Sequence, residues 1–339
     1  MNKNKINLLN SDINKLINLL YKKSKSHPYL VVISMHELFR NLYPHDPYIH
    51  VDKNNFKRIK NTIENIRNFM SSACKLGAYK VTKENIKFNT QDLFGKLWLN
   101  RLNQKKLDSS AVLKDLLKRS DLNIKFFKNK KIIDIGCGSG RFTVAFAKLG
   151  AKLSVGVDLG DDGLKIGRLI AKRQKLKNVK FYKANVLKLP FKNNSFDFVF
   201  CKGVLHHTGN TYRGLSELKR VLKKNSNAFI YLYGSGGIFW RTRKLMRKVM
   251  KEIPLDYSIN VLKMIGMPSR RTIFVDSWYV PIEDHINQNH LETWFKKNKI
   301  EFKKYNKAKK TELEYMEKKE KYFKEFFGSG ELRYVVKKC

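Results

Sequence analysis

The sequence predicts an α/β protein with a mostly parallel sheet, on three observations. From Lys131 to Tyr233, short runs rich in β-branched and aromatic residues alternate regularly with amphipathic stretches, which is typical of βαβ units. Two later runs, IEFKKYN and LRYVV, are joined by a long connection and predict an antiparallel pair at one edge of the sheet. A loop with three glycines directly follows the first predicted strand, where sheets of this kind bind ligands.

The region before the sheet, residues 7 to 76, shows the apolar periodicity of helices. In the clearest case, NNFKRIKNTIENIRNFM, apolar residues recur every three or four positions, at Phe56, Ile59, Ile63, Ile66 and Met70. The following run AYKVTKENIKFN predicts two short strands around a polar turn. Helices followed by a hairpin resemble a winged helix, which dimerises or covers a substrate in some enzymes and binds DNA in other proteins. An irregular helical cap is the alternative.

The strands predicted for the parallel sheet are KIIDIG, LSVGVDL, NVKFYKA, FDFVFCK and NAFIYLY, and two of the helices between them are RFTVAFAKLG and YRGLSELKRVLK. A long excursion from Gly234 to about Asn287 follows the fifth strand, and a helix at LETWFKKN comes next. We expect a helical, winged-helix-like region over residues 1–92 and an α/β domain over residues 93–339. The α/β domain would carry a substrate-covering insertion at about 234–287.

Composition and charge narrow the function classes. The formal net charge of +41 suits binding to polyanions, but lysines occur along nearly the whole chain. The chain is also heavy in Asn and Ile, so we attribute most of the charge to composition and keep nucleic acid as an alternative partner. The four cysteines form no CxxC pair, so we expect neither a metal site nor a disulfide framework.

No stretch approaches twenty uninterrupted apolar residues, and the first residues lack the apolar core of a signal peptide. We therefore expect a soluble, cytoplasmic protein.

The glycine loop lies in KIIDIGCGSGRF, where Gly136, Gly138 and Gly140 follow Asp134 with the spacing GxGxG. The dinucleotide fingerprint has the spacing GxGxxG, and a P-loop requires a Lys and a hydroxyl residue that are missing here. The loop is therefore interpreted as one that a ligand approaches closely, not one that wraps a phosphate. A tight turn or close helix packing is the structural alternative.

Asp158 ends the next predicted strand, twenty residues after Gly138. A carboxylate at this place can accept both hydroxyls of a ribose. Two carboxylates, Asp134 and Asp158, at one cleft of a basic protein suit a ligand with positive charge as well as a ribose, such as S-adenosylmethionine. For Asp158 alone, a surface turn or a helix cap is the alternative.

Four motifs in this order resemble class I S-adenosylmethionine-dependent methyltransferases, in the type 11 branch with ubiquinone/menaquinone C-methyltransferase-like enzymes. They are DxGxGxG at Asp134 to Gly140, the strand-end Asp158, NVLKLPF at Asn185 to Phe191, and FDFVFCKGVLHHT at Phe196 to Thr208. The resemblance is strongest over Lys131 to Tyr233 and does not cover the N-terminal region. It implies a Rossmann-like seven-stranded sheet with one antiparallel strand and helices on both faces.

The resemblance also implies the roles of individual residues toward S-adenosylmethionine. The glycines would pass under its methionine part, Asp158 would hold the ribose, and Asn185 with the backbone of Val186 would meet the adenine edge. The chain around Lys202 would face the amino acid end. Asn185 departs from the more usual Asp, which should weaken the adenine contact modestly. The full set expected to bind the cofactor is Asp134, Gly136, Cys137, Gly138, Gly140, Asp158, Leu159, Asn185, Val186 and Lys202.

Histidines are the candidates for proton transfer. Methyl transfer is an in-line displacement, so a base is needed only where the acceptor must lose a proton. His206 and His207 follow the fourth predicted strand, although similar enzymes also have this pair for packing and helix entry. His285 is the further candidate, with Asp284 adjacent in sequence.

Acceptor recognition is expected in the excursion, which begins GSGGIFWRTRKLMRKVMK. Its aromatic residues could stack on a flat or lipidic acceptor, and its arginines could bind a phosphate or carboxylate. The same basic helix could contact an anionic membrane, or it could be a solvated helix with one buried stripe. The run DSWYVP could be a lid or part of a core. The candidate substrate-binding residues are Phe239, Trp240, Arg241 and Tyr279.

The sequence therefore predicts a methyltransferase for a small-molecule, lipid-linked or sugar acceptor, at oxygen, with nitrogen or carbon left open and a homodimer as one assembly. An RNA-modifying enzyme or nucleic-acid binder is the rival prediction. A scaffold that binds the cofactor without turnover is the third.

Overall fold

The structure is a computed structural model that describes residues 3–42, 55–74, 109–264, 271–305, 307, 313–319 and 321–339. The hairpin predicted at AYKVTKENIKFN, and with it the winged-helix hypothesis, lies outside these residues. The chain divides into two compact units. The helical unit comprises Met1–Lys87, Ser235–Val280 and Lys309–Gly330, and the sheet unit comprises Phe88–Gly234, Pro281–Ala308 and Glu331–Cys339. The domain boundaries predicted from the sequence remain a prediction.

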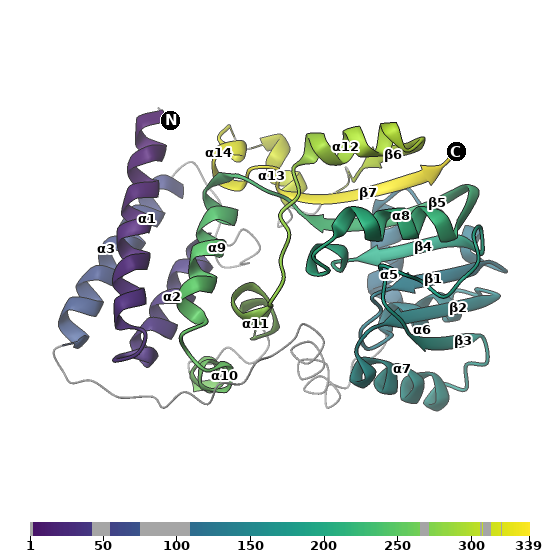
Figure 1. The fold of residues 1–339 in the computed structure, drawn as a ribbon, viewed down its shortest axis with the longest axis horizontal. Coiled ribbons are helices and arrows are strands. Elements are labelled where there is room, and N and C mark those ends of the chain that lie inside the picture. Colours follow the sequence, from purple (N-terminus) through teal and green to yellow (C-terminus); the bar gives the residue numbers. More distant parts are fainter. Residues whose placement is uncertain are drawn as a thin grey trace. The chain divides into compact units, whose positions relative to one another are not determined.

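The helical unit draws its helices from three separate stretches of the chain (Figure 1). In its described part these are α1 (Lys3–Lys23), α2 (Pro28–Leu42), α3 (Asn55–Ala73), α9 (Gly237–Met250), α10 (Leu255–Met264), α11 (Arg271–Tyr279), α13 (Leu313–Lys319) and α14 (Phe323–Phe327). The apolar stripe expected on α3 is buried at Ile59, Ile63, Ile66 and Met70, because the side chains of one helical face point to the same core.

The described part of the sheet unit forms a seven-stranded sheet, in agreement with the prediction. Its strands are β1 (Lys131–Ile135), β2 (Leu153–Asp158), β3 (Val179–Lys183), β4 (Phe196–Lys202), β5 (Leu222–Tyr233), β6 (Ile300–Lys304) and β7 (Glu331–Lys338). The strand order is β3-β2-β1-β4-β5-β7-β6, and β7 pairs antiparallel with both β5 and β6. The expected mostly parallel sheet with an antiparallel pair at one edge is confirmed.

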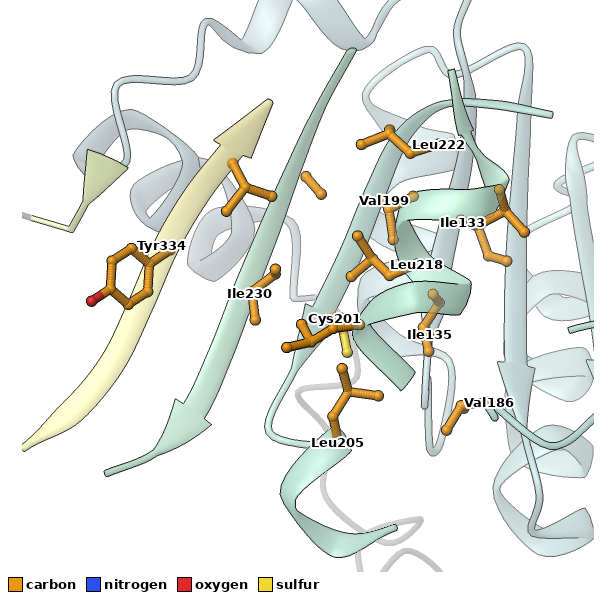
Figure 2. Close-up of a cluster of buried hydrophobic side chains, with 14 of the residues drawn as sticks. Ile133, Ile135, Val186, Val199, Cys201, Leu205, Leu218, Leu222, Ile230 and Tyr334 are labelled. Carbon is orange, nitrogen blue, oxygen red and sulfur yellow. The ribbon is translucent and has the colours of Figure 1, made fainter. Parts of the chain in front are cut away.

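Helices cover both faces of this sheet. They are α5 (Ser110–Arg119), η2 (Ile124–Phe127), α6 (Arg141–Lys148), α7 (Asp161–Arg173), η3 (Leu205–His207), α8 (Thr211–Val221) and α12 (Gln288–Lys297). On β4, Val199 and Cys201 belong to the apolar cluster shown in Figure 2, while Phe198 and Phe200 belong to a second cluster with residues of α5 and α6. Both faces of the strand are buried, which explains its nearly continuous apolar sequence.

The topology brings the carboxyl ends of the parallel strands to one edge, which we call the carboxyl edge. The strand order runs outward from β1 in one direction and from β4 in the other, so the reversal lies between these two strands. Loops at such a reversal point form a crevice for ligands. The glycine loop after β1 and the histidines after β4 therefore belong to the same edge of the sheet.

Among the described helices, none combines the length and the apolar character that crossing a bilayer requires.

Candidate functional site

The glycine loop after β1 has a backbone that favours glycine at three positions. Gly136, Gly138 and Gly140 have φ values of 68°, 52° and 71°, in the left-handed region. The amides of Gly136 and Cys137 donate to the Val157 carbonyl at 2.7 and 2.9 Å, and the amide of Gly140 donates to Cys137 O at 2.9 Å. Because these amides have acceptors within the protein, the loop does not offer them to a phosphate, which fits the interpretation of a close-approach loop.

The same glycines also pack tightly. A Cβ on Gly136 would lie 2.4 Å from the Val204 side chain, and a Cβ on Gly140 would lie 2.5 Å from the Phe181 ring. A tight turn and close packing, the structural alternative, therefore account for part of the need for glycine at these positions.

Asp158 lies at the carboxyl end of β2, beside this loop. Its Oδ2 accepts from the Gly138 amide at 2.8 Å, and its Oδ1 accepts from the Gly160 amide at 2.9 Å. Burial raises the pKa of Asp158, and these amide hydrogen bonds act in the opposite direction. Each carboxylate oxygen has two lone-pair sites, so both can still accept a ribose hydroxyl. The neighbouring Leu159 is an exposed apolar side chain that a bound nucleoside could cover.

Asp134 is a buried carboxyl at the end of β1, and the Thr143 hydroxyl donates to its Oδ2 at 2.7 Å. Burial raises the pKa of Asp134 to about 7, and the charge of Asp158 acts in the same direction. A cation bound nearby would favour the ionised carboxylate. Burial also raises the pKa of the Cys137 thiol, so Cys137 lines the loop as a neutral side chain.

The predicted adenine-facing segment begins with Asn185, which is exposed. Its Oδ1 accepts from the Leu187 amide at 2.8 Å, so the side chain shapes its own turn. Val186 is buried in the core shown in Figure 2. Two residues of α8 that the sequence analysis did not select hold this segment: Leu189 N donates to Glu217 at 2.8 Å, and Arg220 donates to Leu189 O at 2.9 Å.

Lys202 belongs to a row of side chains that crosses three strands. Lys202 on β4 pairs in register with Tyr231 on β5, which pairs with Arg333 on β7. The Lys202 ammonium lies 5.4 Å and the Arg333 guanidinium 4.9 Å from the centre of the Tyr231 ring, in cation–π geometry. The Tyr231 hydroxyl donates to Glu331 at 2.7 Å. No local pattern in the sequence indicates Glu331, because one hundred residues separate it from Tyr231.

His206 is buried, and its bonding favours a positioning role. The Tyr233 amide donates to His206 Nδ1 at 3.2 Å, and the two rings stack at 3.8 Å. The Nδ1 lone pair is therefore an acceptor within the protein, and in the neutral ring the hydrogen lies on Nε2. In that form neither nitrogen is suited to accept a substrate proton.

His207 holds the opposite tautomer. Its Nδ1 lies 2.9 Å from the Ile282 carbonyl oxygen. A carbonyl oxygen only accepts, so Nδ1 carries the hydrogen and the lone pair of the neutral ring is on Nε2. His207 Nε2 therefore has the chemistry of a base.

His285 is paired with Glu283, not with Asp284. His285 Nε2 lies 2.7 Å from Glu283 Oε1, and the Glu283 side chain is 2% exposed against 19% for His285. The carboxylate accepts from Nε2, so the neutral imidazole carries its lone pair on Nδ1. Asp284 instead accepts from the Thr211 hydroxyl at 3.0 Å. Sequence adjacency pointed to Asp284, and no signal in the run EDH separates the two acids.

The segment that carries this pair is fixed to the carboxyl edge. The Asp284 amide donates to His206 O at 2.7 Å, and the Ile286 amide donates to Tyr233 O at 3.0 Å. The structure therefore brings His206, His207 and His285 to the ends of β4 and β5, on one part of the carboxyl edge.

The four candidate substrate-binding residues lie in the helical unit. Phe239 and Trp240 are buried, and Trp240 Nε1 donates to Phe327 O at 3.1 Å. The Tyr279 hydroxyl donates to Ile253 O at 3.0 Å, and burial raises the pKa of Tyr279. Arg241 is exposed. The apolar side of α9 is thus a buried stripe, which was the alternative interpretation of its sequence. Contacts of Phe239, Trp240, Arg241 and Tyr279 with an acceptor remain predictions.

Within the described ranges, no group of three or more His, Cys, Asp or Glu side chains is arranged to hold a metal ion.

Comparisons with known proteins identify the family to which the sheet unit's central region is similar. A family model described as "Methyltransferase domain" matches residues 126–298, just over half of the chain. The demethylmenaquinone methyltransferase of Geobacillus stearothermophilus is 36% identical over 112 residues, which are 32% of this chain and 46% of the relative. An uncharacterized protein of Methanocaldococcus jannaschii is 38% identical over 112 residues, 32% of this chain and 44% of that protein. The chain thus spans about half the length of these curated relatives.

Among solved structures, the YcgJ protein from Bacillus subtilis is similar with a TM-score of 0.44 and 15% identity, over 67% of this chain and 97% of that chain. The family match rests on the region that contains the glycine loop, Asp158 and the histidines. The chain therefore belongs to the methyltransferase domain family, and this region is a methyltransferase domain of the S-adenosylmethionine-dependent class.

Proposed function

We propose that this chain transfers the methyl group of S-adenosylmethionine to an oxygen atom of a small-molecule, lipid-linked or sugar acceptor. The observation that carries the proposal is the composition of the carboxyl edge. The glycine loop and Asp158 lie at the ends of β1 and β2, and two histidines with basic ring nitrogens lie at the ends of β4 and β5. The name of the relative, demethylmenaquinone methyltransferase, supports a small-molecule acceptor.

The residues at the ends of β1 and β2 fit the cofactor by their chemistry. Both Asp158 oxygens retain acceptor capacity for ribose hydroxyls, and the left-handed backbone of the glycine loop forms a tight bend beside them. Asp158 offers a carboxylate to a cationic ligand, and the positive charge of the ligand would favour the ionised form of Asp134 as well. When bound, S-adenosylmethionine supplies an electrophilic methyl group on a positively charged sulfur.

The residues at the ends of β4 and β5 fit an acceptor that must lose a proton. A hydroxyl becomes a stronger nucleophile as its proton moves to a base, and an imidazole lone pair serves at neutral pH. His207 Nε2 is one such lone pair, with its tautomer fixed by Ile282 O. His285 Nδ1 is the other, and the buried Glu283 carboxylate orients its ring and stabilises the imidazolium that forms. These pairs favour oxygen over an acceptor atom that needs no base.

Labelled S-adenosylmethionine with fractionated cell extract tests the proposal. The full chain should place label in a small-molecule, lipid or saccharide fraction. The variant Asp158→Ala, run in parallel at the same protein concentration, should place much less label there. A chain that binds the cofactor by calorimetry but labels no fraction would be a non-catalytic binder, and the proposal would fail.

RNA is the second candidate acceptor, on the single ground of the +41 net charge. Phosphate contacts give a steep loss of affinity with rising salt. Label in the RNA fraction, together with such a salt dependence for mixed RNA, would replace the small-molecule proposal by this one.

A further inference from the structure

The turn between α1 and α2 presents aromatic rings and cations together on the surface of the helical unit. Tyr21 near the end of α1 is 50% exposed, and Tyr29 at the start of α2 is 38% exposed. Lys22 and Lys25, between them in the sequence, are also exposed. Figure 1 shows this turn at the end of α1 that lies away from the N-terminus.

The turn is held by its own hydrogen bonds. The Ser24 hydroxyl donates to Tyr21 O at 2.8 Å, and the His27 amide donates to Lys23 O at 2.8 Å. His27 Nδ1 and the Ser26 hydroxyl share a hydrogen bond of 2.8 Å. Tyr21 and Tyr29 are therefore presented from the ends of two packed helices that meet in a fixed turn.

The sequence of the turn and of the adjoining helix ends carries charge of one sign. Between Ile13 and His36 the sequence contains four lysines, Lys15, Lys22, Lys23 and Lys25, and neither Asp nor Glu. Lysines near a bilayer surface are attracted by anionic lipids. Tyrosine suits the headgroup layer of a bilayer, because its ring is apolar and its hydroxyl is polar.

The contrast with α9 shows what distinguishes the turn. From its sequence, α9 is the other candidate for membrane contact, since it combines apolar residues with arginines and lysines. In the structure, Met246, Val249 and Met250 of α9 are buried, while Arg241 and Lys244 are exposed. The exposed surface of α9 thus provides charge alone, whereas the turn provides charge and exposed aromatic rings.

We infer that the α1–α2 turn, residues Tyr21 to Tyr29, docks this chain on the surface of an anionic lipid bilayer. The tip of a helix pair suits a flat surface, whereas single-stranded nucleic acid is bound in grooves that follow its backbone. The inference goes beyond the proposed function. Its test involves no methyl transfer, so failure of one leaves the other standing.

Cosedimentation of the full chain with lipid vesicles tests the inference. The vesicles contain either phosphatidylcholine alone or three parts of phosphatidylcholine to one part of phosphatidylglycerol. The chain should sediment with the anionic vesicles and remain in the supernatant with the neutral ones. The double variant Lys22→Ser/Lys25→Ser should lower the partition coefficient about 25-fold, because each lysine near the surface contributes about five-fold.

Matched variants in the sheet unit are the controls. Lys172→Ser/Lys177→Ser removes the same charge from exposed positions there, and it should leave vesicle binding unchanged. Tyr21→Ser/Tyr29→Ser should weaken binding even at high salt, whereas Tyr182→Ser, at a similarly exposed ring, should not.

Three outcomes would overturn the inference. One is that the chain does not sediment with anionic vesicles. Another is that Lys22→Ser/Lys25→Ser and Lys172→Ser/Lys177→Ser lose vesicle binding equally, which would mean that the chain binds through its net charge. The third is binding to RNA, without binding to vesicles, that is lost in the Lys22→Ser/Lys25→Ser variant. That result would assign the turn to nucleic acid.

Discussion

The sheet unit and the helical unit of this chain differ in how far local sequence determines their structure. In the sheet unit, β1 to β5 follow one another along one stretch of chain, and the glycine loop directly follows β1. The sheet unit adds β6 and β7 from two further stretches to this run, whereas the helical unit has no such run and is assembled from three stretches that are distant in sequence. Strand patterns and loop motifs therefore describe the first unit, whereas long-range packing decides the second.

Two glycine-rich turns show this long-range packing in the helical unit. The Ser329 amide donates to Ser235 O at 2.7 Å, which joins the start of one stretch to the end of another. Gly328 has a φ of 57°, and a Cβ there would lie 2.0 Å from Ser235 O. Neither GSGG nor GSG indicates its partner in the sequence.

Gly328→Ala should give the largest effect in this comparison. Positive φ and a backbone clash together should destabilise the helical unit by about 4 kcal/mol. Gly236→Ala is the matched control, because its φ is 81° but a Cβ there would lie 3.6 Å from its nearest neighbour. It should cost about 2 kcal/mol, because the φ of 81° and ψ of −175° at Gly236 are essentially confined to glycine. Thermal unfolding measures the stability of both variants. Equal losses of stability would contradict the close packing of Gly328 against Ser235.

Asp134 provides the next test, on the stability of the sheet unit. Its folded-state pKa of about 7 lies above the ordinary value of 3.8, so the folded chain binds this proton more tightly than the unfolded chain. The resulting stabilisation is complete below about pH 4 and is lost as the pH rises through 7. The loss should amount to about 4 kcal/mol, since the pKa differs by about three units and one pKa unit corresponds to about 1.4 kcal/mol.

Denaturant unfolding across this pH range, without cofactor, measures the Asp134 effect. Asp134→Asn does not titrate there, so the difference in unfolding free energy between the variant and the unmodified chain should change with pH. If the unfolding free energies of the variant and the unmodified chain differed by the same amount at every pH, the raised pKa of Asp134 would be refuted. Saturating S-adenosylmethionine should reduce the pH dependence of the unmodified chain, because a bound cation favours the carboxylate.

The histidines test the acceptor side of the carboxyl edge. Replacing the acting base by Gln should lower kcat about 100-fold for a hydroxyl acceptor, with little change in cofactor affinity. Measuring kcat for His207→Gln and His285→Gln identifies which histidine acts as the base. If His285 is the base, Glu283→Gln should lower kcat less than His285→Gln does, and it should shift the pH dependence of kcat. If all three variants keep full activity, the account of proton transfer is wrong.

Asp158→Ala should give the smallest change of the four, on cofactor affinity. Loss of charge-assisted hydrogen bonds to the ribose should weaken S-adenosylmethionine binding by about 1 to 3 kcal/mol. Isothermal calorimetry measures the affinity, and Asp161→Ala is a matched control at an exposed acid on the neighbouring helix. Unchanged affinity in Asp158→Ala would remove the residue from the site.

The sequence predicted the sheet better than the acid–base groups, for a physical reason. Alternation and the glycine spacing act over a few residues, so the strands and the turn after β1 follow from local pattern. The acid that pairs with His285 depends on how the chain folds around it. In the structure this acid is Glu283, while the adjacent Asp284 accepts from Thr211. The burial of Trp240 likewise depends on Phe327, which is far away in sequence.

A crystal structure of the full chain with S-adenosylhomocysteine would decide whether the glycine loop and Asp158 bind the cofactor. We expect the ribose hydroxyls to donate to Asp158 and the amino acid part to lie over the backbone of Gly136 and Gly138. A nucleoside bound away from the ends of β1 and β2, or an Asp158 carboxylate that faces solvent beside an empty crevice, would contradict this expectation.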